Sequence, residues 1–398
     1  GNIVEQKSFN LVEQVSSQGT KRYYDYKEKL QNREEERDKA RKSWKTIGKI
    51  KELKEGYLSS VIHEIAQMVV KYNAIIAMED LNYGFKRGRF KVERQVYQKF
   101  ETMLISKLNY LADKSQAVDE PGGILRGYQM TYVPDNINNV GRQCGIIFYV
   151  PAAYTSKIDP TTGFINAFKR DVVSTNDAKE NFLMKFDSIQ YDIEKGLFKF
   201  SFDYKNFATH KLTLTKTKWD VYTNGTRIQK VKVEGHWLSR EVELTTKMKE
   251  LLDDSHIPYE EGQNILDDLR EMKDITTVVN GILEIFWLTV QLRNSKTDNP
   301  DYDRIISPVL NHKGEFFDSD QYKAYAQKAP LPIDADANGA YCIALKGMYT
   351  VNQIKENWVE GEKLPADCLK IEHASWFAFM QGERGIVDGG FDPDIESK

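Results

Sequence analysis

The chain has 398 residues, of which 40% are hydrophobic and 12% aromatic, so it is long enough for two or more ordinary globular domains. No apolar run approaches the ~20 residues of a membrane span, and the polar start at Gly1-Asn2 predicts no signal peptide. The formal net charge is −3, so a nucleic-acid-binding surface would have to be a local basic patch.

The cysteines are Cys144, Cys342 and Cys368, and their wide separation fits neither a metal site nor a redox motif. We therefore expect buried, reduced thiols and a cytosolic protein.

Apolar and polar residues alternate over residues 1–12, which predicts a strand. Gly1-Asn2 resembles the turn before it, and a domain rarely starts inside a hairpin. We therefore expect the chain to begin partway through a fold.

Residues 21–54 are dense in both charges and lack Gly and Pro until Gly48, which predicts a long exposed helix. Trp44 is its one large apolar group. This helix either is simply solvated, with Trp44 on the core, or lies along a phosphate backbone with Trp44 plugged into a neighbouring domain.

The next segments predict a helix over residues 56–72, a buried strand at residues 74–80, a helix over residues 93–111 and a buried strand at residues 146–150. This alternation indicates an α/β fold with a parallel or mixed sheet. Glu79 comes where the first buried strand leaves the sheet, which is where α/β folds place their chemistry.

The loop after Glu79 is basic, aromatic and rich in Gly. A carboxylate beside a cationic loop suits a metal-dependent enzyme acting on a polyanion, although an acidic strand end with a solvated loop explains the pattern equally well. The cationic residues are Lys86, Arg87, Arg89 and Lys91.

After Pro151 the pattern changes to alternating strands within residues 186–214 and then to helices near residues 243–253, 262–272 and 276–292. We interpret this as an α+β insertion of roughly domain size. Its last helix is expected to end around Arg293, which either meets the helix dipole or clamps a phosphate.

Small residues and spaced aspartates at residues 334–340 lead into a further helix. Asp336 could reach a tight site there, or simply cap the helix. Two-metal hydrolysis of a phosphodiester needs several carboxylates that converge on ions ~4 Å apart. Glu79 and Asp336 form one such pair, with the insertion between them.

Several long motifs resemble the type V-A CRISPR effectors, RNA-guided DNA endonucleases also called the Cpf-one family, in order over essentially the whole chain. EDLNYGFKRGRFKVE at residues 79–93 resembles their second RuvC motif, and DADANGAY at residues 334–341 their third. YVPAAYTSKIDP at residues 149–160 is similar to the start of their Nuc domain. LRNS at residues 292–295, with DY at residues 301–302 and ISPV at residues 306–309, is similar to the Nuc segment that carries its functional arginine. Residues 33–47 resemble their arginine-rich bridge helix.

The resemblance implies an α/β, RNase H-like RuvC core with a bridge helix and an inserted α+β Nuc domain. It implies Mg²⁺, with Mn²⁺ as an alternative, held by Glu79 and Asp336 as catalytic carboxylates. Arg293 and its neighbour Asp301 become the residues that present DNA to the RuvC site. Phosphate contacts come from the loop described above and from the bridge helix, with Trp44 as an interdomain anchor. The bridge-helix contacts are Arg33, Arg37 and Arg41.

The resemblance implies antiviral cleavage of guide-matched double-stranded DNA and of single-stranded DNA. It implies a protein of the prokaryotic cytoplasm that has no membrane partner. The partners are the guide RNA, the DNA and the remaining N-terminal part of the effector, because the first RuvC motif and its aspartate are missing upstream of Gly1. The core is therefore expected to be incomplete, and the fragment alone inactive. The implied domains are residues 1–32 (RuvC strand and connection), 33–46 (bridge helix), 47–150 (RuvC, second motif), 151–330 (Nuc) and 331–398 (RuvC, third motif, and C-terminus).

Two other functions stay open. The chain could be a catalytically incomplete nucleic-acid-binding fragment, in which Glu79→Ala would not impair function. It could also be a RuvC nuclease of a transposon-encoded relative, although the Nuc module of such a protein would be much smaller than residues 151–330.

Overall fold

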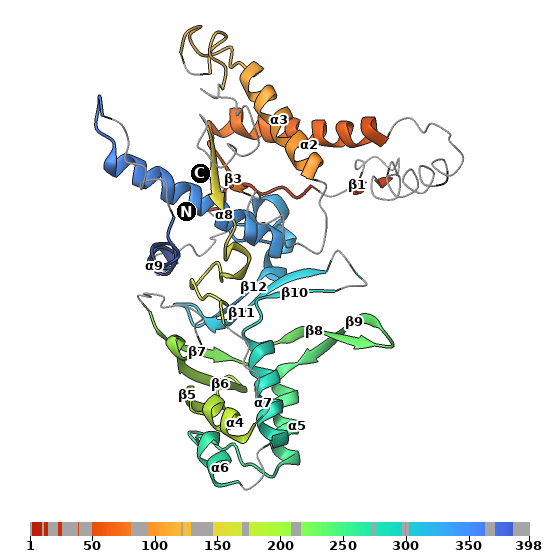
Figure 1. Cartoon of the computed structure of the whole chain (residues 1–398), viewed down its shortest axis with the longest axis vertical. Helices are drawn as coiled ribbons and strands as arrows, with labels where there is room; N and C mark the ends of the chain where they lie inside the picture. Colours follow the sequence, from red (N-terminus) through yellow and green to blue (C-terminus); the bar gives the residue numbers. More distant parts are fainter. Residues whose placement is uncertain are drawn as a thin grey trace. The chain divides into compact units, whose positions relative to one another are not determined.

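The structure, a computed structural model, divides into two compact units, which we describe separately: residues 7–152 form the smaller unit, and residues 1–6 with 153–398 the larger one (Figure 1). It describes residues 2–9, 12–14, 23–25, 39, 50–80, 94–120, 122–128, 146–168, 175–207, 216–272, 276–296, 299, 302–362 and 371–384.

The smaller unit contains a β-α-β arrangement. Strands β3 and β4 pair in parallel, and helices α2 and α3 pack against each other. Helix α2 buries Leu58, Ile62 and Val69, which recur at helical spacing, against Leu104 and Leu108 of α3. The predicted helices and the parallel pairing of the two strands are therefore confirmed. Strand β4 is buried as expected, but Ile75, just before β3, is 51% exposed and Ile76 is only partly buried, so the first strand is less buried than its apolar run predicts. The elements of this unit are β1 (Val12–Gln14), β2 (Tyr23–Asp25), α2 (Ile50–Tyr72), β3 (Ile76–Asp80), α3 (Arg94–Tyr110) and β4 (Ile147–Pro151).

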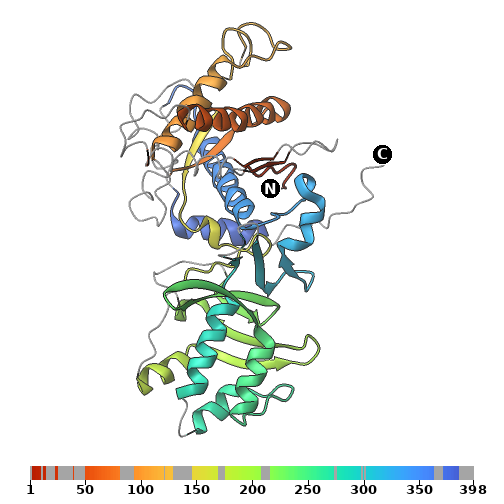
Figure 2. The same cartoon turned by 90° about the vertical axis from the view of Figure 1, so that its right-hand side faces the viewer.

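The larger unit combines antiparallel sheets with helices. The sheet β5-β6-β7 is covered by helices, and α5 and α7 run side by side (Figure 2). A second sheet has the order β10-β11-β12, and β8 pairs with β9 in a hairpin. The elements are η3 (Thr155–Lys157), α4 (Asn176–Leu183), β5 (Phe186–Asp192), β6 (Leu197–Asp203), η4 (Tyr204–Asn206), β7 (Lys218–Tyr222), β8 (Thr226–Val233), β9 (His236–Glu243), α5 (Leu244–Asp254), α6 (Ile265–Glu271), α7 (Thr276–Thr289), β10 (Arg293–Ser295), β11 (Asp303–Leu310), β12 (Phe316–Asp318), η5 (Ser319–Lys328), α8 (Ala335–Asn357) and α9 (His373–Arg384).

Aromatic side chains fill the core between α7 and the first of these sheets. The ring of Phe286 on α7 lies 4.9–5.6 Å, between centroids, from the rings of Phe186, Phe200, Phe202 and Phe207. Every second residue of β6 is buried, as its alternating sequence predicts. The alternation in residues 186–203 therefore does mark hairpin strands.

Helix α8 holds the segment that follows β4. The buried Asn338 donates from Nδ2 to the carbonyl of Ile158 at 2.9 Å, and the buried Lys346 donates from Nζ to the carbonyl of Ala153 at 2.8 Å. These bonds satisfy backbone carbonyls at the start of the insertion. They attach helix α8 to the first residues of the inserted segment.

Two sequence expectations are wrong. Residues 2–9 do not form a strand. The side chain of Gln6 instead donates to the carbonyls of Ala329 and Leu331, each at 3.0 Å, and its backbone N–H donates to the carbonyl of Gln327. Residues 23–25, expected to be helical, form β2 because their backbone pairs with β1. Of the expected bridge helix, only Lys39 lies within the described residues, and it is helical and exposed.

Helix α7 ends at Thr289, before the expected end near Arg293. Arg293 instead begins strand β10, which pairs with β11. It therefore does not meet a helix dipole. Within the described part of the chain, no helix has the length and apolar character needed to cross a bilayer.

Candidate active site

Glu79 lies near the end of β3 in the smaller unit, opposite Val150 in the parallel register. The hydroxyl of Tyr97 on α3 donates to the backbone carbonyl of Glu79 at 2.7 Å, which ties the strand end to the helix. Burial, together with the nearby Glu101 carboxylate, raises the pKa of Tyr97, so the phenol stays protonated as a donor. The side chain of Glu79 is half-buried. The structure therefore places this carboxylate at the carboxyl end of a parallel strand, as predicted.

In the larger unit, Arg293 and Asp303 face each other from neighbouring strands. Arg293 Nε lies 2.9 Å from Asp303 Oδ1, and Nη2 lies 3.1 Å from Oδ2, which is a bidentate pair. The side chain of Asp303 is 14% exposed and that of Arg293 is 42% exposed. The largely buried Asp303 carboxylate therefore fixes the orientation of the more exposed Arg293 guanidinium group.

Asp336 lies in the first turn of α8, and its Oδ1 forms an ion pair with Arg293 Nη2 at 3.0 Å. The side chain of Asp336 is 80% exposed. Asp334 caps the same helix by accepting from the Ala337 amide at 2.6 Å. The capping role that we considered for Asp336 therefore belongs to Asp334, and Asp336 contacts the arginine.

Two carboxylates, those of Asp303 and Asp336, thus contact one arginine. Burial raises the pKa of Asp303, Arg293 opposes this rise, and the negative charges of Asp336 and Asp334 add to it. The cluster holds more negative than positive charge, so a further cation or a proton would stabilise it. The sequence did not single out Asp303, because its pairing with Arg293 depends on the register of β10 against β11.

Carboxylate oxygens suit a hard divalent cation, and exposed Asp336 can serve as one ligand. However, among the residues that the structure describes, no three His, Cys, Asp or Glu side chains are grouped so that they could hold a metal ion. Asp334 is engaged as a helix cap and Asp303 with Arg293. A complete ligand set would therefore need carboxylates beyond those around Arg293.

The remaining predicted site residues lie outside the described residues, so the structure does not test them. They are Asp301, the loop residues Lys86, Arg87, Arg89 and Lys91, the bridge-helix residues Arg33, Arg37 and Arg41, and the anchor Trp44.

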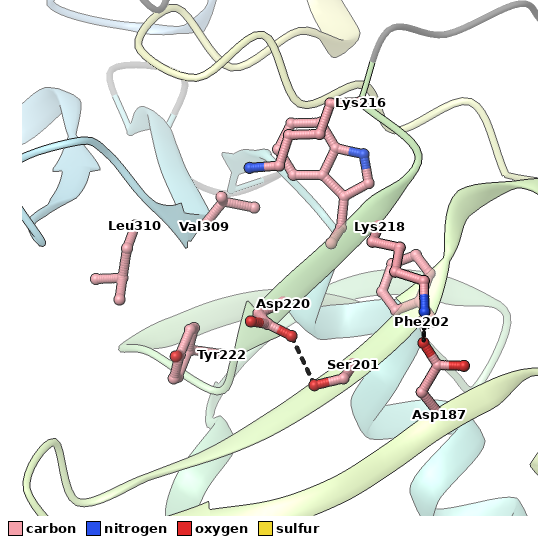
Figure 3. Close-up of a pocket in the computed structure, with 10 residues that line it drawn as sticks. Asp187, Ser201, Phe202, Lys216, Lys218, Asp220, Tyr222, Val309 and Leu310 are labelled. Atoms are coloured by element: carbon pink, nitrogen blue, oxygen red, sulfur yellow. Dashed lines mark hydrogen bonds and ion pairs between the residues drawn. The ribbon is translucent and has the colours of Figure 1, made fainter.

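A separate cavity of about 330 Å³ lies beside β7 and contains none of the predicted site residues (Figure 3). Lys218 pairs with Asp187 at 3.4 Å, and the Ser201 hydroxyl donates to Asp220 at 2.6 Å. Lys216 Nζ lies 4.2 Å from the centre of the Trp219 ring. Two lysines and two aspartates cancel, so this cavity does not attract a polyanion.

These features describe an α/β protein with exposed carboxylates, one of them paired with an arginine, which suits chemistry on a phosphate ester. A comparison with protein-family models matches residues 1–385 to the RuvC nuclease domain. The chain therefore belongs to the RuvC nuclease domain family, and its helices and strands are compatible with an α/β RNase H-like fold. Membership supports a nuclease that cleaves nucleic acid, and such nucleases generally use divalent metal ions.

Proposed function

We propose that this chain is the RuvC and Nuc portion of a type V-A CRISPR RNA-guided DNA endonuclease, which acts in antiviral defence in the prokaryotic cytoplasm. It cleaves the phosphodiesters of guide-matched double-stranded DNA and of single-stranded DNA. Its partners are the guide RNA, the target and the N-terminal part of the same effector. We place its domain boundaries where the resemblance puts them.

The observation that carries this proposal is the contact between Arg293 and Asp336. The resemblance independently gives these two residues functional roles, although they are 43 positions apart in the sequence (336 − 293). Their side chains meet in an exposed cluster of the larger unit. An ion pair with an 80% exposed aspartate contributes little to stability, and it leaves that carboxylate accessible to a ligand.

The residues present have defined roles in this proposal. Glu79 and Asp336 would hold divalent ions, with Mg²⁺ first and Mn²⁺ second, and bound ions would stabilise the attacking and leaving oxygens. Within the described contacts, Arg293 uses Nε and Nη2, so its Nη1 hydrogens can bind a phosphate oxygen. Asp303 holds the guanidinium group in place for that contact. Asp301, the basic loop and the bridge helix add contacts to DNA or RNA.

A cleavage assay with a fluorescent single-stranded DNA reporter tests this function. The chain is mixed with a separately produced N-terminal portion, guide RNA, matching target and Mg²⁺. We expect cleavage that Glu79→Ala or Asp336→Ala abolishes, and that Asp334→Asn, which keeps a side-chain oxygen as the helix cap, retains. The chain without the N-terminal portion is the control for dependence on that partner.

The main alternative is a nucleic-acid-binding fragment without catalysis, favoured by the lack of a three-ligand group among the described residues. In that case the reconstituted complex binds the target but does not cut it, and Glu79→Ala leaves binding unchanged or slightly tighter, because it removes a negative charge. A RuvC nuclease of a transposon-encoded relative would instead cut without this guide.

A further inference from the structure

The hairpin β8–β9 extends beyond the helices of the larger unit (Figure 1). Its two-residue turn consists of Glu234 at φ 48° and Gly235 at φ 87°. Two positive φ angles match the twist of antiparallel strands and give a tight, well-defined turn. The tip is therefore a tight turn of defined geometry.

The tip carries large apolar side chains in solvent. Val233 is 46% exposed, Trp237 is 56% exposed and Leu238 is 50% exposed. The register places Val233 and Leu238 on one face of the ribbon and Trp237 on the other. A large exposed ring contributes little to the stability of a two-stranded hairpin, so Trp237 marks its face as a candidate binding surface. Of the three side chains, Trp237 offers the largest planar face.

Cations share the Trp237 face of the ribbon. The register pairs Lys232 with Trp237 and Lys230 with Ser239, and alternate residues of a strand lie on the same face. Of the acidic residues on this face, Glu241 pairs with Lys296 and Glu243 caps α5 by accepting from the Thr246 amide. The face near the tip is therefore aromatic and positively charged.

The other charged groups of the tip are Glu234 in the turn, and His236 and Arg240 on the opposite face. They add one negative charge and at least one positive charge. The excess positive charge of the tip therefore lies with the two lysines beside Trp237. A polyanion with flat, stackable groups complements this face better than an apolar protein surface does.

The base of the hairpin is fixed to the strand that carries Arg293. The amide of Ile228 donates to Asn294 Oδ1 at 2.9 Å, and Gln291 Nε2 donates to the carbonyl of Ile228 at 3.0 Å. Trp237 and Glu241 are four residues apart on one strand, which spans about 13 Å. Glu241 meets Lys296, three residues after Arg293. The base of the hairpin is thus bonded to the residues that flank Arg293.

We infer that the Trp237 face of the β8–β9 hairpin binds single-stranded DNA, with one base stacked on Trp237 and adjacent phosphates on Lys230 and Lys232. Stacking on an aromatic ring is tolerant of sequence, and the lysines make binding dependent on salt. The inference rests on the proposed function in that it takes DNA as the substrate, but it does not require cleavage. The hairpin would guide a single strand toward Arg293.

The test is fluorescence anisotropy of a labelled twelve-residue oligothymidylate with the full chain in EDTA, so that no cutting occurs. We expect Trp237→Ala to weaken binding about five- to a hundredfold, the effect of one lost stacking contact, and Trp237→Phe to retain most of the affinity. Lys230→Gln with Lys232→Gln should lower the slope of log K against log salt by about 1.4. The matched control is Trp358→Ala, because Trp358 is 61% exposed outside the hairpin.

Equal affinity of the wild type and Trp237→Ala, or no binding by the wild type at 50 mM salt, overturns the inference. So does a Trp237→Ala variant that binds DNA normally but no longer self-associates in light scattering, since the hairpin then contacts protein. The reporter assay of the proposed function separates the two proposals. No cleavage by the wild-type reconstituted complex, together with Trp237-dependent binding in EDTA, would refute the nuclease while leaving the hairpin site intact.

Discussion

Replacing Arg293 with alanine should destabilise the larger unit in a pH-dependent way. The change leaves Asp303, 14% exposed, beside Asp334 and Asp336 without its bidentate partner. Hydrogen bonds to a charged group contribute about 1.5–3 kcal/mol. Because the Arg293 side chain is 42% exposed, solvent screens part of this, and we expect a loss of about 1–2 kcal/mol in the free energy of unfolding at pH 7.5.

The sign of the pH dependence follows from Asp303. Its pKa in the folded protein is already above the ordinary value of 3.8, and Arg293 is the group that lowers it. Without Arg293 the pKa rises further. A carboxyl group with a raised folded-state pKa destabilises the fold at pH values above that pKa, and the penalty fades as pH falls toward 3.8 because the folded state binds the proton more tightly. The loss should therefore be smaller at pH 4.5 than at pH 7.5.

The measurement is urea unfolding followed by circular dichroism at both pH values, with wild type and variant compared at the same pH. Arg270→Ala is the matched control, because Arg270 and its partner Asp267 are 55% and 68% exposed. It should change stability by less than about 0.5 kcal/mol at either pH. An Arg293→Ala loss that is equal at both pH values, or larger at pH 4.5, would refute the electrostatic reasoning.

Other substitutions test the cap and the core. Asp334→Ala should lower the free energy of unfolding by about 1 kcal/mol through loss of the helix cap. Asp336→Ala, at an 80% exposed position, should change it by less than about 0.5 kcal/mol. Thermal unfolding that finds Asp336→Ala the more destabilising change contradicts the assignment of the cap to Asp334. Phe286→Ala should lower the free energy of unfolding by about 3–5 kcal/mol because it removes a central ring of the aromatic core and leaves a cavity. Its control, Tyr325→Ala, removes an aromatic ring that is 47% exposed, and similar losses for both would show that the core packing is misassigned.

Much of the architecture follows from sequence periodicity, because burial imposes it locally. The stripe from Leu58 to Val69 requires a helix with one apolar face, and the apolar run before Glu79 favours a strand, of which the structure buries Met78. In each case one short segment carries the whole signal. The position of Glu79 at a strand end follows from the same pattern.

Features that depend on distant pairing could not be predicted. The apolar pattern of α7 continues past Thr289 to Leu292, but the backbone of Arg293 pairs with Ile305 and so leaves the helix. The partnership of Arg293 with Asp303 depends on that same register. Residues 2–9 alternate like a strand, yet the side chain of Gln6 satisfies backbone groups near Ala329 instead. Local propensity gives no information about which distant segment a strand or side chain pairs with.

The ends of the inserted body meet. Ser307 donates its hydroxyl hydrogen to Asp159, a residue 148 positions earlier, and Asn338 of α8 bonds to the adjacent Ile158. The entropy cost of closing such a loop grows only slowly with its length, so the number of residues between Asp159 and Ser307 has little effect on this closure. Helix α8 also shares its hydrophobic core with the inserted body, through residues such as Tyr341 and Leu345. A change in the packing of that core would therefore alter how Asp336 on α8 meets Arg293 on the body.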